Sequence, residues 1–319
     1  MRYTHGCKPR NPYNMIIQEN HAANRANLII SYFSWPWYNY WINRDKRMKF
    51  KIEKTIFEKI PNLYVGVVVA KGVDNAKKYP EIDHLLKDSL KLAEERFLNK
   101  KVKEDESIVP YREAFRMLGM NPNKFQCSVE ALFTRIAKGK KLPSINPLVD
   151  LNNATSLKHT LPMGTHDLGR SDEDIELRYV RNGDTFVPMG STETEELDND
   201  EVAYLVGNEV RTRRWAWRQS ENGKITAETE YVFFPIDGFK GLNDKEVDKA
   251  AIELAELLER IFKCKVVSGH VDAESSEFEW SLWKTSKRRL AGRKTWLNRP
   301  CHRSLDGKKP RQREGLTRK

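Results

Sequence analysis

The 319-residue sequence lacks the motifs by which several large enzyme classes are recognised. It has no Gly-rich phosphate-binding loop, no GxSxG nucleophile elbow and no HExxH zinc motif. These absences argue against P-loop nucleotide hydrolysis and against metalloprotease chemistry.

Cysteine is also scarce, with only Cys7, Cys127, Cys264 and Cys301 in the whole chain. None forms a CxxC pair, and none lies in a Cys/His cluster with metal-ligand spacing. The sequence therefore predicts neither a disulfide framework nor a zinc site, and we expect no cofactor and no metal. Reduced thiols are typical of the cytosol, so we predict a cytoplasmic protein.

No uninterrupted apolar run is long enough to cross a membrane. The best candidate, residues 27–42, is aromatic but is broken by polar residues and by Pro36. No small-residue cleavage site follows it, as a signal peptide would require. We therefore expect no membrane partner.

The net charge of +11 is distributed unevenly along the chain. Residues 1–47 carry +5, residues 48–280 carry −6 and residues 281–319 carry +12. The basic character thus belongs to the two ends, and the central part is mildly acidic.

The change in composition predicts three segments. Residues 1–47 form an N-terminal extension, which we suppose lies upstream of a natural start at Met48. Residues 48–280 form one domain, and residues 281–319 form a basic, poorly structured tail. Such a tail either binds RNA or DNA or is read-through of a reading frame, and composition does not separate the two.

Helical periodicity appears in four parts of residues 48–280. The ranges are 81–101, 111–118, 128–138 and 244–262, and Ser128 with Glu130 suggests an N-terminal cap for the third. Strand-like runs occupy residues 50–52, 64–70, 175–181, 185–189, 201–207, 209–219, 228–236 and 265–271. Helices and strands in separate runs predict an α+β fold with a mixed, largely antiparallel sheet flanked by helices.

Two polar stretches are candidates for a site. The first, "SINPLVDLNNATSLKHTLPMGTHDL" at residues 144–168, places Asn152 and Asn153 side by side in a short helix. Asparagine is a poor helix former, so the pair either serves capping of the preceding turn or faces a ligand. His166 follows in a loop as a candidate ligand-facing donor, whereas its neighbour Asp167 fits a turn or cap better than a catalytic dyad.

The second stretch is "RTRRWAWRQSENGKIT" at residues 211–226. Strand alternation would place Arg213, Trp215, Trp217 and Gln219 on one face. Two Trp side chains are typical of a core, but Arg and Gln beside them also suit phosphate binding and base stacking.

Together these stretches resemble the B3/B4 tRNA-binding and editing domain of the phenylalanyl-tRNA synthetase beta chain, and more closely its freestanding relatives. The resemblance covers residues 48–273, and residues 144–168 are its most specific part because the family has a similar Pro-Ile-Asn, Val-Asp, Thr-Asn and Pro-Leu-His order. One departure is Gly164, which stands where the family has its histidine, with His166 two residues later. Either His166 replaces that histidine from a shifted loop, or the activity differs, or it has been lost.

The resemblance implies a freestanding protein that hydrolyses mischarged aminoacyl-tRNA in trans, without a metal, with the aminoacylated acceptor end of tRNA as its partner. Positioned water and an oxyanion donor suffice for such a hydrolysis. We predict Asn153 and His166 as the catalytic residues. The predicted substrate-binding residues are Asn146, Gly164, Arg214, Trp217, Arg218, Gln219 and Thr226. The alternative is a non-catalytic module that binds RNA or an amino acid, and the acidic central part counts modestly against wide contact with phosphates.

Overall fold

The computed structural model describes residues 47–98, 100–169, 171 and 173–281. The predicted terminal segments therefore lie outside the described residues, except for Arg47 and Ser281. The first strand begins at Met48 and the last ends at Trp280. The segment boundaries and the supposed start at Met48 stay predictions.

The described residues form an α+β fold, as the sequence predicted. The helices are α2 (Lys54–Lys59), α3 (Pro80–Phe97), the 3-10 helix η1 (Val102–Glu104), α4 (Val109–Met117), α5 (Ser128–Ala137), α6 (Pro147–His159) and α7 (Asp244–Phe262). The strands are β1 (Met48–Ile52), β2 (Leu63–Lys71), β3 (His166–Asp167), β4 (Ile175–Tyr179), β5 (Val202–Val206), β6 (Glu209–Arg213), β7 (Arg218–Gln219), β8 (Tyr231–Phe239), β9 (Lys265–Val271) and β10 (Glu277–Trp280).

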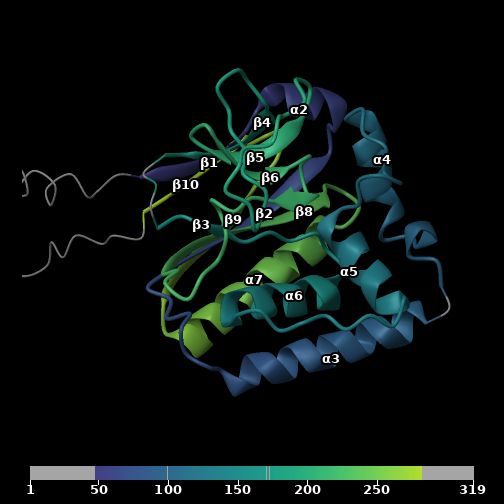
Figure 1. Ribbon diagram of the computed structural model, residues 1–319, viewed down its shortest axis with the longest axis vertical. Coiled ribbons are helices and arrows are strands. Elements are labelled where there is room, and N and C mark those ends of the chain that lie inside the picture. Colours follow the sequence, from purple (N-terminus) through teal and green to yellow (C-terminus); the bar gives the residue numbers. More distant parts are fainter. Residues whose placement is uncertain (1–46, 99, 170, 172, 282–319) are drawn as a thin grey trace, which may run out of the picture. The chain divides into compact units, whose positions relative to one another are not determined.

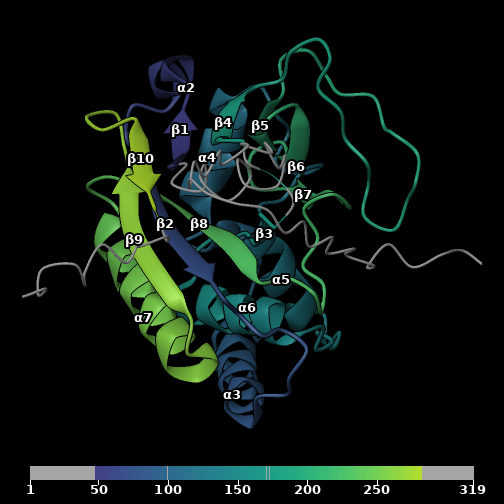
Figure 2. The ribbon, with the colours of Figure 1, turned by 90° about the vertical axis from the view of Figure 1, so that its left-hand side faces the viewer.

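The strands divide between two sheets (Figures 1 and 2). Sheet A has the order β10-β1-β4-β5-β6-β7, and sheet B has the order β3-β8-β2-β9. Among the described strands, β1 with β4 is the one parallel pair, and every other pair is antiparallel. The largely antiparallel character was predicted, whereas the division into two sheets was not.

Strand β2 is buried on both faces because it separates two hydrophobic cores. Val65, Val67 and Val69 point into the core shared with sheet A, whereas Val68 and Ala70 point into the core shared with the helices. This alternation follows from the two-residue period of a strand. β2 is thus continuous in apolar residues, as a strand covered on both faces must be.

Helix α7 lies directly on the outer face of sheet B, with α6 packed on α7 and α3 packed on α6 (Figure 1). Two glycines allow the close approach of α7. A β-carbon at Gly66 would lie 2.6 Å from Val247 Cγ1, and one at Gly238 would lie 2.4 Å from Val247 Cγ2. Real β-carbons do not approach so closely, so the sheet needs glycine at both positions to seat the Val247 side chain.

The helix predicted at residues 244–262 forms with those bounds, and the N-terminus of α6 shows a clear cap. Asn146 precedes Pro147, and its Oδ1 accepts a hydrogen bond from the Val149 amide at 3.1 Å. The predicted cap at Ser128 is wrong. The N-cap of α5 is Cys127, without a side-chain hydrogen bond, and Ser128 is the first helical residue.

The predicted continuous strand over residues 209–219 is also wrong. β6 ends at Arg213, a turn follows, and β7 begins at Arg218. Arg214 and Trp215 have φ angles of 49° and 60°, the left-handed region that non-glycine residues rarely adopt. The turn breaks the alternation, so Trp215 is fully buried while Trp217 is half-buried. Strain of this kind persists only where the surrounding structure holds it, and here the Trp215 amide donates to the Val202 carbonyl at 2.6 Å.

The predicted strand at residues 185–189 is reduced to isolated bridges at Thr185 and Pro188. Pro188 has no N–H to donate to a ladder, which explains why no strand forms.

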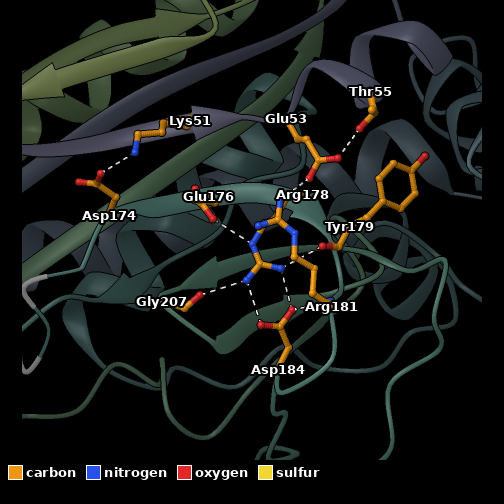
Figure 3. Close-up of polar contacts among 10 residues, drawn as sticks. All are labelled: Lys51, Glu53, Thr55, Asp174, Glu176, Arg178, Tyr179, Arg181, Asp184 and Gly207. Atoms are coloured by element: carbon orange, nitrogen blue, oxygen red, sulfur yellow. Dashed lines mark hydrogen bonds and ion pairs between the residues drawn. The ribbon is translucent and has the colours of Figure 1, made fainter.

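The long connection from β4 to β5 is anchored by the buried Arg178 (Figure 3). Its guanidinium donates to both Asp184 oxygens, at 2.6 and 2.9 Å, and to Glu176 at 2.9 Å. It also donates to the Gly207 carbonyl at 3.2 Å, which ties the connection to the hairpin after β5. Because the Arg178 guanidinium donates to several different residues, it holds the base of the connection in place.

Within the described residues, no helix has the length and apolar character required to cross a membrane.

A candidate ligand pocket between the sheets

A small cavity of about 90 Å³ lies where β8 of sheet B faces β5, β6 and the β6–β7 turn of sheet A. It is lined by Ser128, Met163, Gly164, Thr165, His166, Tyr204, Thr212, Trp215, Ala216, Trp217, Gln219, Pro235 and Asp237. Four residues predicted as site residues meet there, two from each polar stretch: Gly164, His166, Trp217 and Gln219. Its walls combine apolar and aromatic side chains with several polar groups, as is typical of a small-ligand site.

Asp237 is the charged residue of the pocket and is 2 % exposed. Its Oδ1 accepts hydrogen bonds from Tyr204 Oη at 2.6 Å and from Trp215 Nε1 at 2.8 Å. No described residue donates to Oδ2. Burial raises the pKa of Asp237 to about 6, although the two donors oppose this by favouring the charged form. The pocket therefore holds a carboxylate that is ionised at neutral pH and lacks a cationic partner.

His166 lies on β3, where it pairs with Phe233 of β8. The ring is stacked on Phe233 with centroids 5.8 Å apart, and Nε2 lies 2.9 Å from Thr212 Oγ1. Burial, aided by the charge of Arg211, lowers the pKa of His166 to about 3. The imidazole is therefore neutral at physiological pH. Its Nδ1 is buried without a hydrogen-bond partner among the described residues.

Other polar groups of the wall differ in how far they are satisfied. Gln219 Nε2 donates to the carbonyls of Thr165 at 2.5 Å and Gly223 at 3.1 Å, which leaves Oε1 without a donor among the described residues. Ser128 Oγ is buried without a partner there as well. The Asp237 and Gln219 oxygens are thus open acceptors, and the Ser128 hydroxyl can donate or accept.

Gly164 lies beside His166. Its amide donates to the Pro235 carbonyl at 3.0 Å. A β-carbon at Gly164 would lie 3.1 Å from Pro235 Cγ and 3.6 Å from His166 Nε2. A side chain at position 164 would therefore meet Pro235 first and lie in ordinary contact with the His166 ring. The three alternatives for His166 stay predictions.

Arg214 and Arg218 flank the Trp217 ring, each guanidinium 5.8 Å from its centroid. Neither lines the pocket, and both are ion-paired with the β4–β5 connection: Arg214 with Asp198 and Arg218 with Glu195 at 3.0 Å. The other arginines of this stretch are paired too, Arg211 with Glu209 and Arg213 with Glu195 and Glu201. The arginines of this stretch, which would suit phosphate binding, are therefore neutralised by carboxylates.

The remaining predicted residues lie elsewhere. Asn146 caps α6 and lines a separate cavity of about 470 Å³, and its Nδ2 donates to the Ile225 carbonyl at 3.3 Å, next to Thr226. Asn153 is half-buried on α6 and does not line the pocket between the sheets. The structure thus separates Asn153 from His166, and it supports a structural role for Asn146.

Sequence reasoning missed Asp237, and also Tyr204 and Thr212. One sequence feature could have pointed to Asp237: it is an aspartate within the apolar run "VFFPIDGF", in a strand that is covered on both faces. A buried carboxylate in such a run requires partners, and these come from sheet A and the β6–β7 turn, which local patterns do not show.

Among the described residues, no group of three or more His, Cys, Asp or Glu side chains is placed to hold a metal ion. The predicted independence from metal stays a prediction.

Comparison with known proteins relates the central part of the chain to one family. Residues 110–263 match the family model of the B3/4 domain. This range contains all the residues that line the pocket. This part of the chain is therefore similar to a B3/4 domain, in agreement with the resemblance.

A search of solved structures finds 17 matching chains. One is an N-terminal fragment of the phenylalanyl-tRNA synthetase beta subunit from Pyrococcus horikoshii, with 12% identity and a TM-score of 0.38. The match covers 69% of this chain and 53% of that one, so the chain spans about half the length of the fragment. Among curated proteins, no sequence matches.

Proposed function

We propose that this chain binds the aminoacylated 3′ end of a tRNA and hydrolyses the aminoacyl ester in trans, in the cytoplasm and without a metal. The observation that carries the proposal is the pocket itself. The two stretches that resemble the editing domain converge on it, and it encloses a buried carboxylate, Asp237.

The proposed reaction is a simple ester hydrolysis. Water adds to the ester carbonyl carbon, and the bond from that carbon to the ribose oxygen breaks. The proton of the water passes to the ribose oxygen, so that the products are a free amino acid and an uncharged tRNA end. The ester is already activated by its ribose leaving group, so holding water and ester together supplies much of the acceleration.

The residues of the pocket have separate roles in this proposal. The amino-acid part of the substrate enters between Trp215 and Trp217, and Asp237 lies at the buried end. Thr212, held by His166 at 2.9 Å, offers a hydroxyl group to position water. His166 acts as a neutral hydrogen-bonding group rather than as an acid, because burial keeps its pKa at about 3.

A binding module without catalysis is the second candidate. It is favoured by the separation of Asn153 from His166 and by the burial of His166 Nδ1, because the predicted catalytic pair is not assembled. In that case the same pocket holds the aminoacyl group without cleaving it.

The experiment is incubation of the full chain with a panel of correctly and wrongly charged tRNAs, followed by measurement of the released amino acid. The proposal requires release from at least one mischarged tRNA above the spontaneous rate, and loss of that release in Thr212→Val. Thr194→Val, an exposed residue of the β4–β5 connection, is the matched control and should retain activity. Binding of the charged tRNA with no release from any of them would leave the module as the function.

A further inference from the structure

The pocket carries a negative charge that no cation of its wall balances. None of its lining residues is Lys or Arg, and Asp237 is nine-tenths buried or more. An unpaired buried charge is costly, so proteins rarely keep one without a use for it.

The fold does not require that charge. Tyr204 Oη and Trp215 Nε1 both donate to the same oxygen, Oδ1, at 2.6 and 2.8 Å. An asparagine would offer the same acceptor oxygen to both donors. What a carboxylate adds is the charge and the second oxygen, Oδ2, which receives no hydrogen bond from the described residues.

The surroundings of Oδ2 suit a cation. The pocket is bordered by the aromatic rings of Tyr204, Trp215 and Trp217. Aromatic faces attract ammonium groups, most strongly where water is excluded. Gln219 also lines the pocket, and its Oε1 receives no hydrogen bond from the described residues.

We propose that the pocket is a receptor for a primary ammonium group, which forms an ion pair with Asp237 and packs against the rings of Tyr204 and Trp215. If the proposed function holds, that group is the free α-ammonium of the aminoacyl ester, so that N-acylated aminoacyl-tRNA is excluded from the site. A cavity of about 90 Å³ accepts an ammonium group with a few carbon atoms, not a large side chain.

A matched pair of small molecules tests this without tRNA. Alaninamide and lactamide are nearly isosteric, but only alaninamide carries an ammonium group, and neither is an ester. Their binding to the full chain is measured by ligand-observed NMR and by quenching of Trp fluorescence at pH 7. We expect alaninamide to bind about tenfold more tightly than lactamide or better, since only its ammonium group forms a charge-assisted hydrogen bond with the carboxylate.

Two variants complete the test. In Asp237→Asn the preference for alaninamide should disappear, while thermal unfolding shows that the protein remains folded. Asp248→Asn is the matched control, because Asp248 also accepts a tyrosine hydroxyl, that of Tyr64 at 2.7 Å, but lies exposed on α7. It should retain the preference.

Equal affinity for the two amides in the unaltered protein, no measurable binding of alaninamide, or an undiminished preference in Asp237→Asn would overturn the inference. The result is independent of hydrolysis. Binding of alaninamide by a protein that releases no amino acid from tRNA would refute the proposed function alone. Rapid hydrolysis by a protein that does not distinguish the two amides would refute the receptor alone.

Discussion

At the residue scale, Asp237 couples recognition to stability. Burial raises its pKa to about 6 in the folded protein, against 3.8 for a solvent-exposed aspartate, so folding disfavours the ionised form. This cost is absent below pH 3.8, grows as the pH rises to 6 and is complete above pH 6. By the same linkage it amounts to at most about 3 kcal/mol.

We therefore expect Asp237→Asn to be more stable than the unaltered protein at pH 7.5, by up to about 3 kcal/mol, because both donors to Oδ1 keep their acceptor. The difference should shrink as the pH is lowered toward 4. Urea unfolding at pH 7.5, 6 and 4.5 measures it. A variant that is less stable at pH 7.5 would show that the charge supports the fold.

The affinity for alaninamide should rise with pH as Asp237 ionises. The other titratable groups around this carboxyl do not change charge between pH 5 and 7: burial raises the pKa of Tyr111 and Tyr204 far above 10 and that of Cys127 to about 12, and it lowers that of His166 to about 3. Below pH 6 the affinity should fall about tenfold per pH unit. Titrations at pH 5, 6 and 7 check this, and a flat profile would assign the binding to another group.

At the element scale, the packing of α7 on sheet B depends on small residues in the strands. Gly238→Ala should destabilise the protein by about 1–3 kcal/mol, because the new methyl group overlaps Val247 Cγ2. In a Val247→Ala background the same substitution should cost clearly less, since the overlapping methyl is gone. Denaturant unfolding of the unaltered protein, the two single variants and the double variant gives the coupling free energy between positions 238 and 247. Identical costs of Gly238→Ala in both backgrounds would contradict this account of the contact.

The elements also show what the sequence could predict. The helix at residues 244–262 was predicted with its observed bounds because its apolar residues recur at helical spacing over five turns. The run at residues 209–219 was not, because Arg214 and Trp215 adopt left-handed conformations that normally call for glycine or asparagine. Tertiary contacts hold that turn, among them those of the buried Trp215 indole. Such contacts cannot be read from the local sequence.

Only part of the candidate pocket could be predicted, because local sequence patterns do not show tertiary contacts. The resemblance located Gly164 and His166, and the aromatic pattern located Trp217 and Gln219. Asp237 was missed because its place in the pocket depends on hydrogen bonds from Tyr204 and Trp215, which are distant in sequence.

At the scale of the whole molecule, the basic charge does not coincide with the pocket. Residues 48–280 carry a net charge of −6, and the arginines beside Trp217 are paired with carboxylates of the β4–β5 connection. Figure 2 shows this connection extending from the sheets next to β6 and β7. The side chains of Asp198 and Glu195 are 65% and 40% exposed, and ion pairs this exposed are weak. A phosphate group can therefore compete for the arginines.

Removal of these carboxylates should strengthen RNA binding. We expect the double variant Glu195→Gln with Asp198→Asn to bind a single-stranded 3′-terminal RNA about tenfold more tightly at low salt, with a steeper loss of affinity as salt is raised. Glu256→Gln with Glu259→Gln removes two charges from α7 and serves as the control. Equal gains in both double variants would indicate a general charge effect rather than competition at Arg214 and Arg218.

The most direct measurement compares one mischarged tRNA carrying a free α-amino group with the same tRNA after N-acetylation. Release of the amino acid by the full chain is followed for both, and the spontaneous rate of each ester is subtracted. The account predicts hydrolysis of the free ester and a rate at least about tenfold lower for the acetylated one, with the difference abolished in Asp237→Asn. Equal rates for the two esters, or no enzymatic release from either across the panel, would contradict it.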